Sequence, residues 1–181
     1  MIISLNPGGG GKDFQRKDYS KFQNGNFSIP KQNHYVTYNN KFAKETRNLF
    51  EGNDDVLKTS MVTRVLFFRS ENMSYWKDHN PQKTRSAMEK FSYDKLQQIL
   101  DKVKPKKLLV IGMDTYRRLG KHVIKIENEN VIENFGSVGR IITAKTGQIE
   151  IFVTPHLSAC YISIKNKNKM KKLFANFLTL T

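Results

Sequence analysis

The chain is poor in cysteine and in acidic residues. Its one cysteine, Cys160, excludes a disulfide framework and the cysteine-rich sites that hold zinc or iron–sulfur clusters. We therefore expect a reduced, cytoplasmic protein with no metal and no cofactor. No apolar run approaches the roughly 18 residues that span a bilayer. The first residues also lack the basic start and apolar core of a signal peptide. These absences predict no association with a membrane.

The shortage of acidic residues leaves a large positive charge. The 181 residues include 31 Lys and Arg but only 16 Asp and Glu, which gives a formal net charge of +15. Such a charge predicts an acidic partner, of which nucleic acid is the simplest. An anionic membrane surface and a protein of the nucleic-acid machinery are the competing explanations. The length suits a single domain over residues 1–181, which we expect to be a monomer.

Apolar residues alternate between strand-like runs and helical spacing along the chain. This alternation predicts the α/β class, as a single three-layer α/β/α domain with a central, mostly parallel sheet. The expected strands cover 1–5, 61–68 as a central strand, 108–111, and a hairpin of 140–143 with 149–153. The expected helices lie at 40–51, on both sides of the strand within 92–120, and at 170–178. Residues 12–40 and 70–91 are expected to be loops.

A glycine-rich loop, residues 6–11, follows the first expected strand. Such loops can hold a phosphate through their backbone N–H groups. A P-loop would need glycine at position 6 and Ser or Thr at 13, where the chain has Asn6 and Asp13. A dinucleotide fingerprint that starts at Gly8 would also need glycine at 13. Both nucleotide motifs are excluded, which leaves a flexible turn or a site at the carboxyl end of a strand.

A second polar loop, Pro155-His156-Leu157-Ser158, follows the last expected strand. A single histidine is more often structural than catalytic. His156 differs because it follows a strand and lies at a turn that Pro155 makes rigid. An imidazole there can donate a hydrogen bond to an oxygen that gains negative charge in a transition state.

Together the two loops resemble the signature motifs of the uracil-DNA glycosylase superfamily. In that family a Gly-x-Asp/Asn-Pro motif supplies the residue that activates water, and a His-Pro-Ser motif supplies the histidine that stabilises the departing base. The resemblance implies that Asn6 orients the water and His156 stabilises the base, with Leu157 in place of the second motif's proline. The further substrate contacts that it implies are Pro7, Gly8, Gly9 and Ser158.

Two more positions extend the resemblance. Phe27 is similar to the family's aromatic residue that stacks on the flipped base. The family's base-selecting asparagine corresponds to Arg64. An arginine has only donors, so it reads carbonyl oxygens and cannot reproduce the paired donor and acceptor that asparagine offers to uracil. Alternatively, Arg64 is a strand-end residue that pairs with an acid or a phosphate.

The resemblance implies a DNA glycosylase that acts in base excision and DNA repair. Such an enzyme hydrolyses the N-glycosidic bond of a flipped-out pyrimidine, uracil or a modified base, and leaves an abasic site. The alternatives are a glycosylase specific for a hypermodified phage base in antiviral defence, and a non-catalytic DNA-binding member of the fold. The residues expected to contact phosphates of double- or single-stranded DNA are Lys12, Arg69, Lys165 and Lys167.

Overall fold

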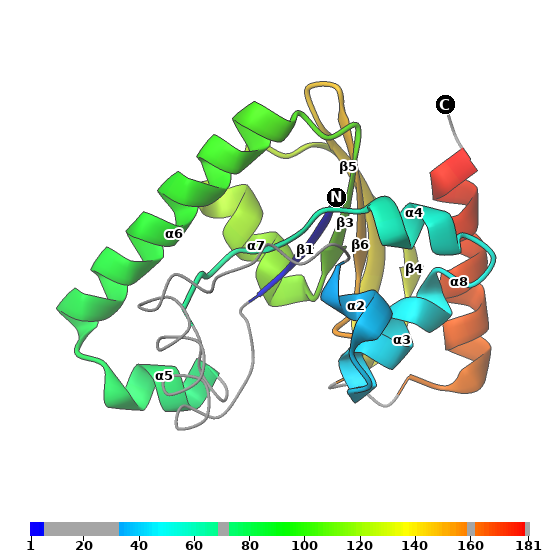
Figure 1. Ribbon diagram of the computed structural model, residues 1–181, viewed down its shortest axis with the longest axis horizontal. Coiled ribbons are helices and arrows are strands. Elements are labelled where there is room, and N and C mark those ends of the chain that lie inside the picture. The colour runs from blue at the N-terminus through cyan, green and yellow to red at the C-terminus, as the bar shows by residue number, and fades with distance from the viewer. Residues whose placement is uncertain (6–32, 69–72, 159–161, 180–181) are drawn as a thin grey trace.

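A six-stranded sheet in the order β2-β1-β3-β6-β5-β4 forms the centre of the molecule (Figure 1). The computed structural model describes residues 1–5, 33–68, 73–158 and 162–179. The parallel part of the sheet consists of β2 (Val62–Arg64), β1 (Ile2–Ser4), β3 (Lys107–Ile111) and β6 (Ile149–Thr154). The antiparallel part consists of β5 (Arg140–Thr146) and β4 (Glu127–Asn134), which the one-turn helix η1 (Gly136–Val138) connects. This sheet confirms the predicted α/β class.

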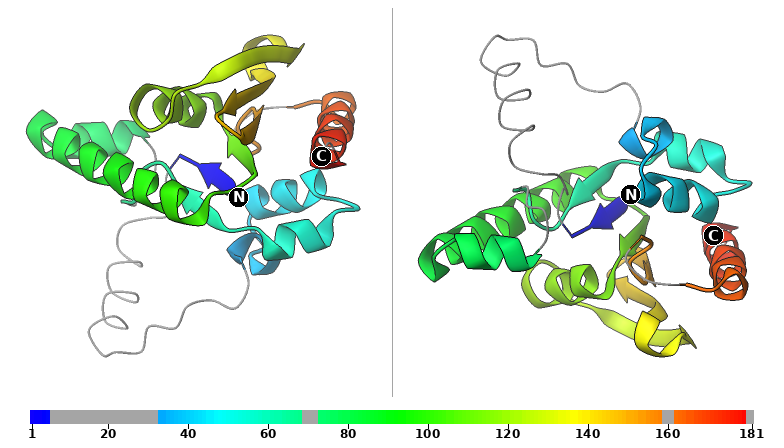
Figure 2. Two further views of the ribbon diagram at one scale, coloured as in Figure 1. Left: turned by 90° about the horizontal axis from the view of Figure 1, so that it is seen from above. Right: turned by 90° about the horizontal axis from the view of Figure 1, so that it is seen from below.

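Helices cover both faces of the sheet. One face carries α6 (Gln82–Val103), which follows the short α5 (Met73–His79), and α7 (Met113–His122). The other face carries α2 (His34–Thr37), α3 (Lys41–Leu49), α4 (Asp54–Thr59) and α8 (Ile164–Thr179). Figure 2 shows this separation from two sides, with α6 to the left of the sheet and α8 to the right. No helix in the described ranges combines the length and the apolar character needed to cross a membrane.

The alternation of side chains along the strands builds a core on each face. Leu109 and Phe152 pack with α3, α4 and α8, whereas the next residues, Val110 and Val153, pack with α6 and α7. These four side chains are at most 3 % exposed. Parallel strands that are buried on both faces consist of continuous apolar residues, which is why the sequence predicts β3 and β6.

The segments around β2 and α6 are among those that differ from the sequence prediction. The sequence predicts a central strand over 61–68, but β2 covers only Val62–Arg64 and lies at an edge of the sheet. The sequence predicts a loop over 70–91, but α5 and the first ten residues of α6 lie there. The first half of α6 projects beyond the core and is mostly exposed, so it has no apolar stripe from which a helix could be recognised.

Candidate functional site

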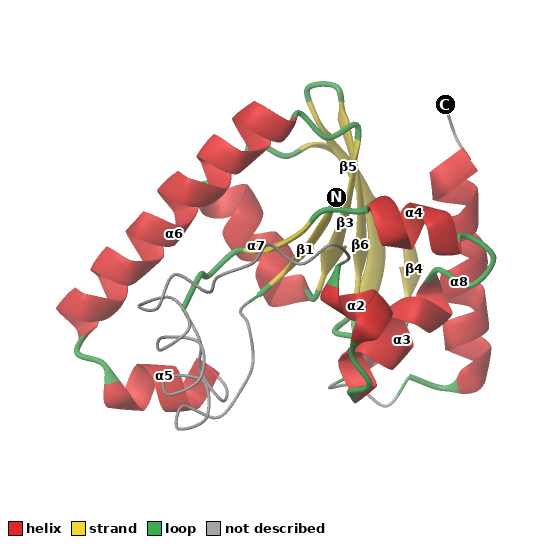
Figure 3. Cartoon of the chain, in the orientation of Figure 1, coloured by secondary structure: helices red, strands yellow, loops and turns green. Residues whose placement is uncertain are grey.

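The four parallel strands end in register at one edge of the sheet. Arg64, the last residue of β2, aligns with Ser4, the last residue of β1. Ile111, the last residue of β3, aligns with Thr154 of β6. Figure 3 shows that α2 and the start of α3 lie beside the sheet toward this end. We refer to this end as the carboxyl edge, because sites in parallel sheets form where the strands finish.

The predicted site residues are divided between the described and the remaining parts of the chain. His156, Ser158 and Arg64 lie at the carboxyl edge. Seven others lie outside the described residues: Asn6, Pro7, Gly8, Gly9, Lys12, Phe27 and Arg69. β1 ends at Ser4, two residues before Asn6 in the sequence. The convergence of Asn6 with His156 therefore stays a prediction.

His156 is held between the start of α3 and the start of α7. Its ring packs against the ring of Phe42, with 5.3 Å between the centroids. On another side lies Gly112, where an added Cβ would stand 3.7 Å from His156 Cδ2. The Gly112 N–H donates to the Thr154 carbonyl at 2.8 Å. This bond joins the residue after β3 to the last residue of β6, so the chain is tied to β3 two residues before His156.

The surroundings of His156 favour the neutral ring and place a hydroxyl beside one of its nitrogens. Burial lowers the pKa of His156 below its ordinary value, because the charged form loses hydration. Ser158 Oγ lies 3.5 Å from His156 Nδ1. A hydroxyl that donates to Nδ1 leaves the ring proton on Nε2. In that tautomer, a neutral His156 can act as a hydrogen-bond donor through Nε2.

Arg64 is held in place by contacts from its own strand and from α2. Its Nη1 donates to the Thr63 carbonyl at 3.0 Å, and its Nη2 lies 2.7 Å from His34 Nε2. Because a guanidinium has donors only, His34 Nε2 must accept this bond, which makes His34 neutral with its proton on Nδ1. The guanidinium carbon also lies 5.4 Å from the centre of the Tyr35 ring, a cation–π contact.

Four aromatic rings connect Arg64 to His156 along the carboxyl edge. In order they are His34, Tyr35, Phe42 and His156, with centroid separations of 4.2, 5.4 and 5.3 Å; we refer to them as the aromatic row. Burial raises the pKa of the Tyr35 phenol, and the charge of Arg64 offsets part of this rise. The aromatic row therefore runs along the carboxyl edge with an imidazole at each end, and its Tyr35 is buried in the core.

Sequence reasoning missed the first half of this row. It assigns residues 12–40 to a loop, whereas His34 and Tyr35 lie on α2. The one local signal is Asn33, whose side chain accepts from the Tyr35 N–H at 2.8 Å as a helix N-cap does. A helix of four residues is too short to show a period. The Arg47 guanidinium fixes α2 on α3 by donating to the Tyr35 and Tyr38 carbonyls.

The two described lysines predicted to contact phosphate differ in their surroundings. Lys165, in the first turn of α8, is exposed. Lys167 lies 2.5 Å from the Glu45 carboxylate on α3. Lys171 makes a similar pair with Glu51, at 2.5 Å. Lys167 and Lys171 therefore attach α8 to α3 and to the turn that follows it, whereas Lys165 projects into solvent.

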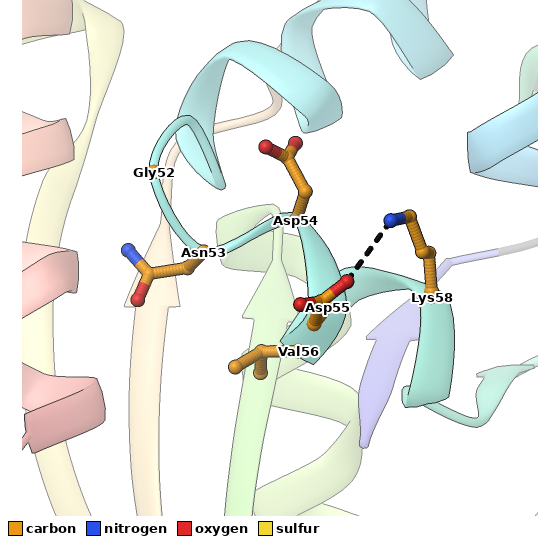
Figure 4. A pocket seen from close by; sticks show the side chains of 6 residues that line it. All are labelled: Gly52, Asn53, Asp54, Asp55, Val56 and Lys58. Carbon is orange, nitrogen blue, oxygen red and sulfur yellow. Dashed lines mark hydrogen bonds and ion pairs between the residues drawn. The ribbon is translucent and has the colours of Figure 1, made fainter.

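A depression on the surface of the described residues lies elsewhere. Its volume is about 440 Å³, and it is lined by Gly52, Asn53, Asp54, Asp55, Val56 and Lys58 at the start of α4 (Figure 4). This segment leads into the start of β2, away from the carboxyl edge. Asp55 and Lys58 in it form an exposed pair at 2.9 Å. In the described ranges, no group of three or more His, Cys, Asp or Glu side chains is placed to hold a metal ion.

Comparisons with known proteins do not assign the chain to a family. No protein-family model matches it, and no curated protein matches its sequence. The carboxyl edge, with its aromatic row and Arg64, is therefore the basis of the functional proposal.

Proposed function

We propose that the chain is a DNA N-glycosylase related to the uracil-DNA glycosylases, which releases a flipped-out pyrimidine and leaves an abasic site. One observation supports this most: His156, a partly buried imidazole whose pKa burial lowers, lies where β6 ends, and β1 ends at the same edge. Only β3 separates these two strands, so their ends are about 10 Å apart. Side chains that follow the two strands could then reach one nucleotide.

In the proposed reaction the electron pair of the C1′–N bond leaves with the base. The sugar becomes oxocarbenium-like, the base becomes anionic, and water adds to C1′ while a proton from it ends on the base. His156 Nε2–H donates to the base oxygen on which the negative charge collects. A donor that is already in place stabilises such a charge without reorganising at the moment of reaction.

The other predicted residues have supporting roles in this proposal. Ser158 Oγ, 3.5 Å from His156 Nδ1, holds His156 in the required tautomer if its hydroxyl donates in that contact. Asn6 orients the attacking water through its amide oxygen, which cannot act as a strong base. The charge of +15 supplies the attraction to DNA, with Lys165 as an exposed phosphate contact beside the carboxyl edge.

The test is an assay for abasic sites in oligonucleotides that carry uracil, mismatched thymine, or cytosine with different substituents at C5, and in phage genomic DNA. The wild-type protein should create alkali-labile sites in at least one substrate, and His156→Ala should lose this activity. His122→Ala is a matched control, because His122 is exposed on α7 and stacks on Tyr93 at 4.5 Å. A wild-type protein that releases no base from any substrate would refute the proposal.

A further inference from the structure

Arg64 and His34 form a unit at the end of β2 whose donors and acceptors can be assigned. The 2.7 Å contact joins Arg64 Nη2 to His34 Nε2, and the imidazole must be the acceptor in it. His34 comes from α2, and Asn33 ahead of it donates through Nδ2 to the Leu57 carbonyl at 2.5 Å. The backbone of α2 is thus tied to the segment before β2, and the imidazole holds the guanidinium in one orientation.

This unit lies on the side of the sheet where the aromatic row lies. Arg64 is two residues after Val62, which packs against the core cluster that contains Tyr35 and Phe152. Residues two apart in a strand share a face, so Arg64 projects toward α2. From there the aromatic row leads to His156. The ends of β2 and β6 are three strand spacings apart, about 14 Å. A base bound along the aromatic row with its O2 at His156 would turn the adjoining edge toward Arg64.

The chemistry of arginine limits which base edge can meet it. The Watson–Crick edge of uracil or thymine carries a donor, N3–H, between two carbonyl oxygens. A guanidinium opposes this N–H donor to donor, because it has no acceptor. In a cytosine ring N3 is unprotonated, so N3 and O2 are two neighbouring acceptors. O2 is the one carbonyl oxygen of this ring and is the atom that would meet His156, so the guanidinium would donate to its neighbour N3, which in uracil or thymine is a donor.

We propose that Arg64 reads the edge of a pyrimidine of the cytosine type, with His34 as the positioning residue that orients the guanidinium. This inference rests on the proposed function, since it names the substrate class of the same site. A preference for the cytosine edge would distinguish this protein from enzymes that select uracil. The substituent at C5 of the cytosine ring does not face Arg64, so cytosine, 5-methylcytosine and 5-hydroxymethylcytosine are the natural set to compare.

A binding experiment without a chemical step tests the reading directly. The ligands are single strands built from abasic tetrahydrofuran spacers, each with one central nucleotide. Its base is cytosine, one of the two C5-substituted cytosines, or uracil. At fixed salt, the wild-type protein should bind at least one cytosine-type strand roughly tenfold or more tighter than the uracil strand. Arg64→Asn should lose or reverse this ratio, because the asparagine amide offers both a donor and an acceptor. Lys102→Asn, with the same loss of charge on an exposed residue of α6, should keep it.

Variants of His34 test the positioning role. The amide oxygen of His34→Gln can still accept from the guanidinium, so this variant should keep the ratio between the cytosine-type and uracil strands. His34→Leu cannot accept, and its ratio should fall toward one. Both variants need only be folded at the assay temperature. A variant that is merely destabilised binds all strands more weakly by the same factor, which leaves the ratio of affinities unchanged.

The outcomes separate this inference from the glycosylase proposal. A wild-type protein that binds the uracil strand as tightly as every cytosine-type strand, or tighter, overturns the inference even if it releases uracil. An unchanged ratio in Arg64→Asn overturns it too. Absence of base release from every strand refutes the glycosylase proposal instead, and the binding ratio then still decides whether Arg64 reads a cytosine-type edge.

Discussion

Gly112 is the backbone position on which the placement of His156 depends most directly. Its φ of +99° lies in a region that L side chains rarely adopt. An alanine Cβ there would stand 3.3 Å from Thr115 Oγ1, a tight contact, and 3.7 Å from His156 Cδ2. Thr115 cannot easily retreat, because its hydroxyl donates to the Ile111 carbonyl at 2.7 Å inside the core.

Gly112→Ala should therefore cost both stability and function. A residue forced into a glycine-only conformation costs about 1–3 kcal/mol, which corresponds to a fall in melting temperature of about 3–9 °C for a chain of this size. Any relaxation that relieves the contact with Thr115 moves the loop that borders His156. Base release should then fall by more than the loss of folded protein explains.

Thermal unfolding by circular dichroism, with base release measured well below the transition, checks both effects. Gly147→Ala is the matched control, because Gly147 also has a positive φ, +57°, but nothing lies within 4 Å of its Cβ position in the hairpin turn. It should lose stability only and keep the rate of the folded protein. A Gly112→Ala protein as stable and as active as the wild type would refute the reasoning.

Three further predictions follow from the charged and catalytic groups. Burial lowers the pKa of His156 in the folded protein. Below about pH 6.5 the unfolded chain therefore binds more protons at this residue than the folded protein does. The free energy of unfolding should then fall as the pH decreases from about 6.5 toward the folded-state pKa. Chemical denaturation of wild type and His156→Gln between pH 7.5 and 5.5 checks this, and parallel curves would contradict it. Lys165→Ala should reduce the slope of log affinity for duplex DNA against log salt by about 0.9. Lys167→Ala should instead lower the melting temperature, because it loses the ion pair with Glu45. Equal salt slopes in the two variants would exclude Lys165 as a phosphate contact. The double variant Asn6→Ala/His156→Ala should lose less activity than the two single losses multiplied, since both groups act in one transition state, and full additivity would argue against a shared step.

The buried elements could be predicted from the sequence because burial leaves a pattern. β3 and β6 are continuous apolar runs, and the hairpin between β5 and β6 contains the turn residue Gly147. β4 was not predicted, since its eight residues include three glutamates and five of the eight are exposed at the sheet edge. A polar edge strand has no local pattern that distinguishes it from a loop.

The candidate site could be predicted only in part, for a related reason. His156 was accessible to sequence reasoning because it follows a strand that the sequence predicts, and parallel strands gather their ends at one edge. His34 was not, because its significance comes from a contact with Arg64, 30 residues away. Nothing in the four residues of α2 indicates that contact.

The most direct test of the central claim is the rate of abasic-site formation by wild type and His156→Ala, measured in single turnovers on the best substrate. Removal of a donor that stabilises the departing base should lower the rate about 10²–10³-fold, with DNA affinity at fixed salt unchanged and His122→Ala like the wild type. An equal rate in wild type and His156→Ala would contradict the proposed role of His156, and no abasic sites with any substrate would contradict the glycosylase itself.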